Sequence, residues 1–313
     1  MTPHNTLRAI DEDGKLILVD SKSRSTTFDH IYTVESSTKI ADTYQEFNLQ
    51  IGLPKHPATL EPMPMMHWQT HYFEDMVIAR EKRKGKFPLH VHENKARQIG
   101  ATDNGQRFFA FHGSGEYEKR DIHWYVGKKI INIAGTREKT AKKIQHRLRI
   151  LFNNIENTIA DNGTDLWFKL KNGTEFESLP SNSEAIRGDT KIGAIGVDEA
   201  AHFDMQDDSP VIDAIIPISD TNIADLFLRS TPNGKRGFFY NIDVTENDFI
   251  KMKFPIYVAE GHLYSKEQIQ VMVARKDVDV EQEYLCQYTA SQANIFGSLN
   301  VDPALIPKDW DSI

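Results

Sequence analysis

A short apolar run that ends in two adjacent acids constrains this chain more than any other stretch. Residues 191–203 read KIGAIGVDEAAHF, and the uncharged part of this segment ends at Asp198 and Glu199. Such a run is typical of a strand buried in a parallel sheet. In open α/β sheets ligands bind beyond the carboxyl ends of the strands, so we expect the two acids to lie at a site. One acid could hold Mg²⁺ while the other polarises a water for nucleotide hydrolysis, although a solvated acidic turn is the alternative.

Composition limits the class of protein. The 313 residues carry a formal net charge of −8, with 39% hydrophobic and 26% charged residues, which is ordinary for a soluble globular protein. This charge argues against a surface that coats nucleic acid everywhere, but it leaves room for a local basic patch. Cys286 is the only cysteine, so no disulfide can form within the chain and a reducing cytosol is the expected compartment. No stretch approaches the ~18 apolar residues of a membrane span, and we expect no membrane partner.

A loop that follows a predicted strand has the parts of a phosphate-binding site. Residues 93–102 read ENKARQIGAT, in which Gly100 would allow close backbone approach and Thr102 would offer a hydroxyl to Mg²⁺. The usual pattern places a lysine directly after the last glycine, but Ala101 occupies that position here. Lys95 offers a cation from the front of the loop and is therefore the candidate substitute. Taken alone, the segment favours a basic surface turn over a phosphate-binding loop.

Two predicted helices carry weaker signals. The first spans residues 67–83, where Gln69 could read an adenine edge with its amide or could simply be solvated. The second spans residues 137–159 and is amphipathic, with a basic face that is either solvated or contacts DNA. The cations of this basic face are Lys139, Lys142, Lys143, Arg147 and Arg149.

Two loops near the acidic strand carry candidate nucleotide contacts. Arg187 precedes a glycine and could act as an arginine finger in a neighbouring subunit, or could pair with Glu184 or Asp189. After a predicted strand at 224–229, Thr231 and Asn233 could sense the γ-phosphate, or could form an ordinary Pro-Asn-Gly turn.

Taken in order, these segments resemble large terminase subunits, the genome-packaging ATPases of tailed viruses. Residues 95–102 resemble the deviant Walker A loop of that family, and residues 137–159 the helix that follows it. The Arg187-Gly188 pair, the acidic strand and residues 231–240 resemble its later motifs. The resemblance implies an α/β fold of the P-loop NTPase (ASCE) type, with a mainly parallel sheet and helices on both faces.

The resemblance, together with the chemistry of the residues, implies ATP and Mg²⁺ as cofactors. Asp198 and Thr102 would hold Mg²⁺, and the expected catalytic residues are Glu199, Arg187 and Arg97. The expected nucleotide contacts are Lys95, Gln98, Gly100, Ala101, Thr102, Gln69, Thr231 and Asn233.

We expect three parts along the chain. Residues 1–60 would form a small β-rich extension, 61–290 the ATPase domain, and 291–313 a tail or linker. The RNase H-like nuclease that normally follows in the family does not fit into the remaining length, so we expect no nuclease activity. Such a nuclease would be a separate polypeptide or would have been removed by truncation.

The expected function is ATP-driven translocation of double-stranded DNA into a viral procapsid, in the cytoplasm of the infected host cell and transiently at the portal. The resemblance implies as partners DNA, a portal protein, a small terminase subunit, and copies of this chain in a homo-oligomeric ring, a pentamer in the family. A P-loop helicase or remodelling ATPase is an alternative. A nucleotide-binding scaffold that does not hydrolyse ATP is another, because the usual lysine position is Ala101.

Overall fold

A mainly parallel sheet forms the centre of the molecule. The computed structural model describes residues 6–10, 16–20, 39–134, 138–155, 158–180, 190–203 and 209–289. Within these residues eight strands form one sheet in the order β10-β3-β9-β8-β4-β7-β6-β5. Neighbours from β10 to β7 are parallel, whereas β6 pairs antiparallel with both β7 and β5. The strands are β3 (His90–Lys95), β4 (Lys129–Ala134), β5 (Ile159–Thr164), β6 (Trp167–Leu170), β7 (Glu175–Pro180), β8 (Ile192–Asp198), β9 (Asp225–Ser230) and β10 (Ile250–Phe254). The expected α/β architecture is confirmed.

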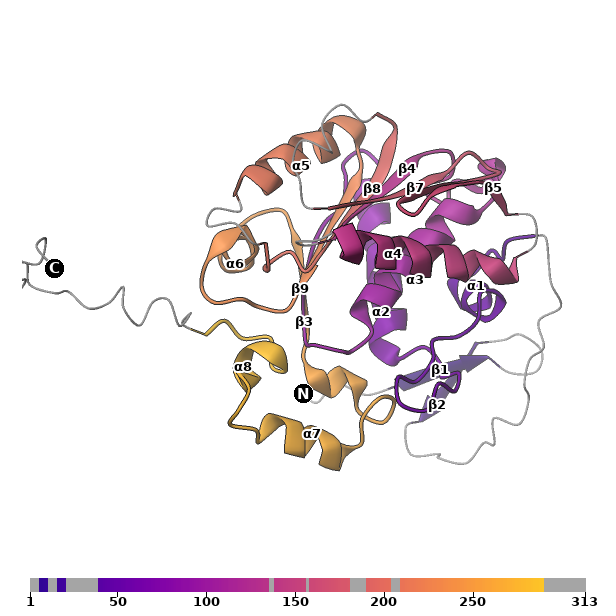
Figure 1. Ribbon diagram of the computed structural model, residues 1–313. Helices are drawn as coiled ribbons and strands as arrows, with labels where there is room; N and C mark the ends of the chain where they lie inside the picture. Colours follow the sequence, from indigo (N-terminus) through magenta and orange to yellow (C-terminus); the bar gives the residue numbers. More distant parts are fainter. Residues whose placement is uncertain are drawn as a thin grey trace, which may run out of the picture.

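Helices cover both faces of this sheet (Figure 1). Residues of β4 alternate between the two faces, so that Ile130 belongs to one apolar core and Ile131 to the other. The first core also takes side chains from α1 (Tyr44–Gln50), α2 (His67–Arg83), α3 (Ala101–Ser114) and α4 (Glu138–Leu151). The second takes side chains from α5 (Ser209–Asn222) and α6 (Gly237–Val244). Beyond the sheet, α7 (Lys266–Val273) and α8 (Val280–Glu283) follow β10.

The strand order aligns the carboxyl ends of three strands. β9 lies between β3 and β8, with Asn94 opposite Ser230 and Asp198 opposite Arg229. The loops that leave β3, β8 and β9 therefore start at the same edge of the sheet. This edge is where an open α/β sheet binds its ligands.

Several local predictions are confirmed, while some boundaries differ. The pair Asn172-Gly173 predicts a hairpin turn from the sequence, and it joins β6 to β7 with Gly173 at a φ of 88°. The helix predicted over 137–159 is shorter than expected and ends at Leu151. Residues 153 and 154, shortly after this end, are both asparagine, which is a weak helix former. The sequence of residues 280–288 also predicts a helix, but this prediction is wrong in length, because α8 ends at Glu283 and Cys286 has a left-handed φ of 56°. Within the described residues, no helix is both long and apolar enough to cross a lipid bilayer.

Residues 6–10, 16–20 and 39–60 of the predicted amino-terminal extension lie in the described part of the chain. β1 (Thr6–Ile10) and β2 (Leu16–Asp20) pair as an antiparallel ribbon. The boundary at residue 60 stays a prediction, although Tyr44 and Phe47 of α1 pack in the same core as α3. The tail predicted over 291–313 lies outside the described residues.

Both edges of the large sheet carry polar residues. On edge strand β10 the side chains of Lys251 and Lys253 are exposed, and Lys251 Nζ donates to the Asp243 carbonyl over 3.0 Å. On the opposite edge, residues 160–164 of β5 are exposed. Charged and exposed edge strands resist pairing with further strands.

A buried ion pair ties β3 to β9. Arg229 Nε donates to Glu93 Oε2 over 2.6 Å and Arg229 Nη2 donates to Glu93 Oε1 over 2.9 Å. The Tyr72 hydroxyl donates to the same carboxylate over 2.8 Å. Burial opposes the charge on Arg229, but Glu93, Tyr72 and Asp198 together outweigh this, and the pKa of Arg229 is raised. The guanidinium lies against Gly105 of α3, where a Cβ atom would be 2.2 Å from both terminal nitrogens.

We predict that Gly105→Ala lowers the free energy of unfolding by about 3 kcal/mol, because the new methyl group would displace a buried ion pair. Helix propensity alone predicts the opposite, a gain of about 1 kcal/mol. Urea denaturation followed by circular dichroism measures the change. Thr70→Ala, at an exposed position within α2, is the control and should be close to neutral. A stabilised Gly105→Ala variant would show that the guanidinium can move aside.

Candidate active site

Side chains from two strand ends form an ion pair at the carboxyl edge of the sheet. Lys95 is the last residue of β3 and its side chain is only 7% exposed. Its Nζ donates to Glu199 Oε1 over 3.1 Å, and Glu199 directly follows β8. Lys95 therefore occupies the end of the strand and points toward the acidic pair, so its ammonium lies at the carboxyl edge of the sheet.

The loop from β3 to α3 has the backbone of an anion cradle. Gln98 and Gly100 have left-handed φ angles of 59° and 81°, and Gly100 is the N-cap of α3. In the described part of the chain, the N–H groups of residues 98–103 donate no hydrogen bonds. The positive end of the α3 dipole lies at the same point, since Ala101 begins the helix. Free N–H groups at a helix amino terminus favour a bound phosphate.

Oxygen ligands suitable for Mg²⁺ meet beside this loop. Thr102 Oγ1 lies 3.0 and 3.1 Å from the two carboxylate oxygens of Asp198. Burial raises the pKa of Asp198, while Arg229 opposes that rise. No group of three or more His, Cys, Asp or Glu side chains suited to a metal exists among the described residues. Mg²⁺ in nucleotide sites typically uses one or two protein oxygens plus phosphates and water, so Asp198 and Thr102 fit it.

The turn after β8 is held against the loop after β9. Glu199 has a left-handed φ of 55°, which costs on the order of 1–3 kcal/mol in a residue other than glycine. Asn233 Nδ2 donates to the Ala201 carbonyl over 2.9 Å, and Thr231 is buried beside the same turn. Backbone strain of this kind clusters at functional sites. The structure thus brings Thr231 and Asn233 to the acidic turn.

Two predicted contacts have partners that change how they could act. Arg97 is paired with Glu283 of α8 through Nε and, at 3.1 Å, through Nη2, and the hydrogen bond to Glu283 raises the pKa of Arg97. Gln69 is buried and its Oε1 accepts the Met66 N–H over 2.8 Å. The amide nitrogen of Gln69 faces Gly100, 3.6 Å from where a Cβ of that glycine would lie. Arg187, the predicted arginine finger, lies outside the described residues.

Sequence reasoning missed the residues that support the loop from behind. The Glu93–Arg229 pair lies beneath the site, and Tyr264 donates its hydroxyl to the Gln98 carbonyl over 3.2 Å. Arg229, directly after the apolar run Leu226-Phe227-Leu228, was the one sequence signal for the ion pair, because β3 reads HVHENK and a further charge in it does not stand out. No sequence signal links Tyr264 or Glu283 to the loop, because both are far from it along the chain.

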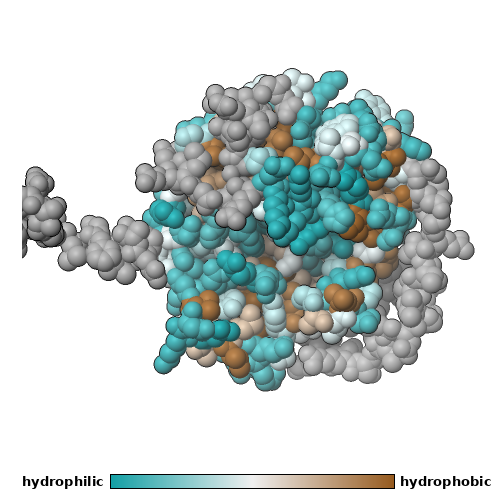
Figure 2. Space-filling view, viewed as in Figure 1, coloured by the Kyte–Doolittle hydropathy of each residue, from teal (hydrophilic) through white to brown (hydrophobic). Residues whose placement is uncertain are grey.

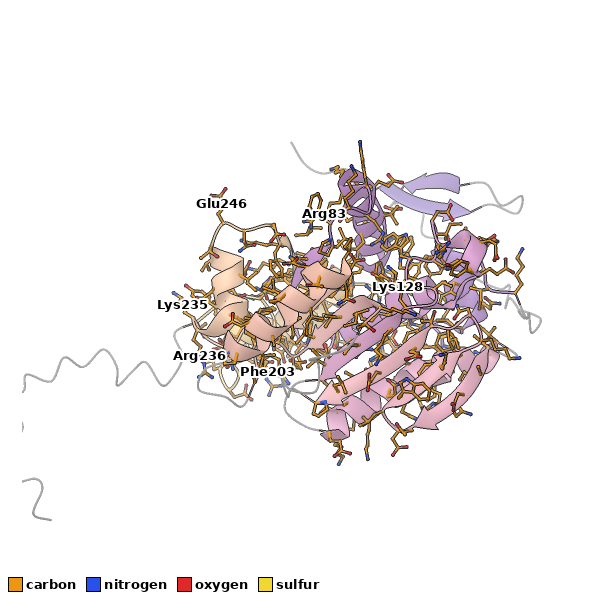
Figure 3. The ribbon with its side chains drawn as sticks, turned by 90° about the horizontal axis from the view of Figure 1, so that it is seen from above. Arg83, Lys128, Phe203, Lys235, Arg236 and Glu246 are labelled. Atoms are coloured by element: carbon orange, nitrogen blue, oxygen red, sulfur yellow. The ribbon has the colours of Figure 1, made fainter. Side chains whose placement is uncertain are left out.

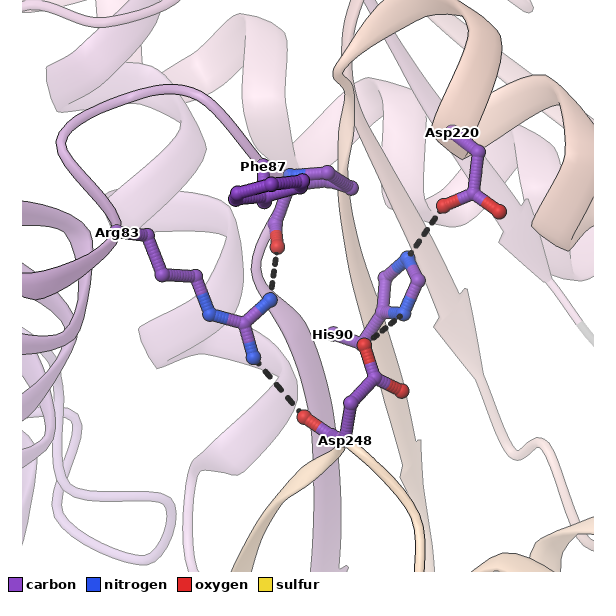
Figure 4. A pocket seen from close by; sticks show the side chains of 6 residues that line it. Arg83, Phe87, His90, Asp220 and Asp248 are labelled. Carbon is purple, nitrogen blue, oxygen red and sulfur yellow. Dashed lines mark hydrogen bonds and ion pairs between the residues drawn. The ribbon is translucent and has the colours of Figure 1, made fainter.

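A cavity lies at the other end of β3 (Figure 4). Its volume is about 270 Å³, and it is lined by Arg83, Phe87, Pro88, His90, Asp220 and Asp248. His90 Nδ1 lies 3.3 Å from Asp248 and His90 Nε2 lies 3.6 Å from Asp220. None of the loop, acidic or hydroxyl residues described above lines it. The candidate site is therefore the carboxyl edge of the sheet, and this cavity is separate from it.

A basic stripe runs along α4. Figure 2 shows a hydrophilic area where Figure 1 places this helix. Lys139, Lys143 and Arg147 are exposed there, whereas Lys142 pairs with Glu138 and Arg149 donates to backbone carbonyls of residues 162–167. Of the five cations predicted on this face, two have partners within the chain. The other three are exposed and make no hydrogen bond or ion pair with the described residues.

The chain matches a model of one protein family. The model is described as the amino-terminal part of the terminase large subunit of T4-like virus type, and it matches residues 94–300, more than half of the chain. No curated protein sequence matches.

Three solved structures resemble the fold. The large terminase of bacteriophage HK97 is 14% identical with a TM-score of 0.55, over 78% of this chain and 54% of that one. The large terminase of a thermophilic bacteriophage is 14% identical with a TM-score of 0.50, over 72% and 53%. The large terminase ATPase domain of Thermus phage P74-26 is 18% identical with a TM-score of 0.48, over 65% and 89%. The chain thus spans about half the length of the first two of these proteins.

We predict that Lys95→Met weakens the affinity for ATP by about 10- to 100-fold, the worth of a charge-assisted hydrogen bond of about 1.5–3 kcal/mol. Arg97→Met is the matched control, because the Arg97 guanidinium is already bound by Glu283. This control should change the affinity by less than about threefold. Titration with a fluorescent ATP analogue measures both. Equal losses in the two variants would contradict the assignment of Lys95 as the phosphate ligand.

Proposed function

Because the chain belongs to the terminase large subunit family, we propose that it is the ATP-hydrolysing motor subunit that translocates double-stranded DNA into a viral procapsid. One observation carries this proposal: a cation, an acidic pair and a hydroxyl-bearing loop meet where β3, β8 and β9 end in register. These are the groups that phosphoryl transfer to water needs, because its catalysis is mostly positioning and charge stabilisation.

We infer a division of roles at the nucleotide. Lys95 and the free N–H groups of residues 98–103 bind the phosphates, with Gly100 allowing their close approach. Asp198 and Thr102 hold Mg²⁺, which when bound neutralises charge on the phosphates. Glu199 accepts a hydrogen bond from the attacking water and orients it, once its contact with Lys95 has been released or shared.

Three other predicted contacts have more limited roles in this proposal. Arg97 reaches the nucleotide only by leaving Glu283, so we give it a secondary role. Gln69 offers only its amide nitrogen to the nucleotide, since its oxygen caps α2. Arg187 supplies a finger to a neighbouring subunit, which requires a ring of copies of this chain.

The remaining partners follow from the proposed motor. They are double-stranded DNA, a portal protein and a small terminase subunit, which the chain would meet in the cytoplasm of an infected host cell. The alternative function, a nucleotide-binding scaffold that does not hydrolyse ATP, was suggested by Ala101 at the usual lysine position. This alternative is less favoured because the ammonium of Lys95 lies at the same edge of the sheet. ATPase turnover measured with and without DNA tests the proposal, and no turnover under either condition would contradict it.

We predict that Glu199→Gln binds ATP but lowers turnover by about 10²-fold or more, because the amide keeps the size of the side chain and loses its basicity. Steady-state phosphate release gives turnover, and a nucleotide titration gives affinity. Glu260→Gln, at an exposed position, is the control and should leave both unchanged. A Glu199→Gln variant with turnover within about threefold of wild type would remove Glu199 from the catalytic role.

A second prediction concerns the three exposed cations of α4. Replacing Lys139, Lys143 and Arg147 by glutamine should weaken binding to double-stranded DNA and lower the salt slope of log K by about 0.9 for each lost phosphate contact. Basal ATPase turnover without DNA should not change. The matched control replaces three exposed lysines in and after the last turn of α2, Lys82, Lys84 and Lys86. If both triple variants lose DNA affinity equally, the effect is one of net charge and α4 is not a specific contact.

A further inference from the structure

One imidazole connects the two halves of the site. His202 Nε2 lies 2.9 Å from Thr231 Oγ1, within hydrogen-bond distance, and 3.9 Å from Glu199 Oε2. Thr231 follows β9 and is only 1% exposed, whereas Glu199 follows β8. His202 therefore lies between the residue proposed to sense the γ-phosphate and the residue proposed to orient the water.

The backbone around this imidazole holds it in place. The Ala200 N–H donates to the Arg229 carbonyl over 3.1 Å, and the Ala201 N–H donates to Ser230 Oγ over 3.1 Å. The His202 N–H donates to the Glu199 carbonyl over 2.9 Å and closes the turn. With the bond from Asn233 to Ala201, these contacts join the acidic turn to the loop after β9. A shift of either segment must therefore move the other.

The charges around the imidazole favour its neutral form. Burial lowers the pKa of His202, and Arg97 and Lys95 lower it further, while Glu199 and Glu283 oppose them. A neutral imidazole has one donor and one acceptor nitrogen, so Nε2 makes one hydrogen bond at a time. Its partner at present is Thr231, and the contact with Glu199 at 3.9 Å is too long for a hydrogen bond.

The loop continues from Thr231 toward the surface. Lys235 and Arg236 are exposed where the loop enters α6, and Figure 3 shows them at the edge of the molecule. The ring of Phe203 lies 5.8 Å from the ring of Phe238 in α6, so the acidic turn packs against this helix as well. The connection at His202 thus belongs to a continuous path from the site to α6.

We propose that His202 is a positioning residue that couples the Thr231 hydroxyl, beside the γ-phosphate, to the Glu199 carboxylate, beside the attacking water. This inference rests on the proposed ATPase function. His202 does not touch the reacting atoms. It fixes Thr231 through Nε2 and, through the joined turn, keeps Glu199 in the orientation that hydrolysis needs.

The test separates the hydrogen bond from a packing role. His202→Ala should lower kcat by about tenfold or more with little change in KM, because the phosphates are held by other groups. His202→Gln places an amide near the position of Nε2 and should retain at least about a third of wild-type kcat. Thr231→Val should resemble His202→Ala, and the double variant should lose no more than either single variant, since one link has been broken twice.

Each outcome decides between the alternatives. Absence of ATPase turnover in the wild-type chain, alone and with DNA, would overturn the proposed function itself. Turnover in wild type with an unchanged kcat in His202→Ala would overturn only the role of His202. Equal losses in His202→Ala and His202→Gln, a raised KM with normal kcat, or additive losses in the double variant would do the same. If His202→Ala unfolds in a thermal melt, His202→Gln and Thr231→Val still decide the matter through kcat.

Discussion

The ion pair between Glu93 and Arg229 is the contact on which the geometry of the site depends. It joins neighbouring strands β3 and β9, receives the Tyr72 hydroxyl from α2 and presses on α3 at Gly105. Side chains two residues apart on a strand share a face, so fixing Glu93 also aims Lys95. Thr231 likewise follows Arg229 by two residues. A buried ion pair is often a poor source of stability, but it specifies one register, and the site needs that register.

The fold and the main motifs were accessible from the sequence because local physics encodes them. The apolar run of β8 can only be buried, and its acids then emerge at the carboxyl edge. The Asn172-Gly173 turn requires positive φ, which identified the hairpin. The loop before α3 was identified through Gly100 and Thr102, even though its lysine stands at an unusual position. The roles assigned to these residues remain predictions.

Long-range pairing was not accessible from the sequence. Arg97 looked like a free cation, but it pairs with Glu283, which lies far along the chain. The end of the helix predicted over 280–288 was missed because Cys286 has a left-handed φ, a buried side chain and a carbonyl that accepts from Asn94 Nδ2 of β3, far away along the chain. The link between His202 and Thr231 joins two loops that follow different strands. In each case the contact joins residues that are far apart along the chain. The periodicity of apolar residues in the sequence carries no information about such contacts.

The edges of the sheet restrict how copies of this chain can associate. Lys251 and Lys253 stand exposed on β10, and β5 presents polar residues at the opposite edge. A neighbouring molecule would have to strip water from these groups to add a strand. Association by continuous sheet is therefore disfavoured, and contact through helices and loops is left. Such contacts can loosen and re-form without disturbing the strand register, so a subunit could change neighbours or orientation during a cycle while its own core stays intact.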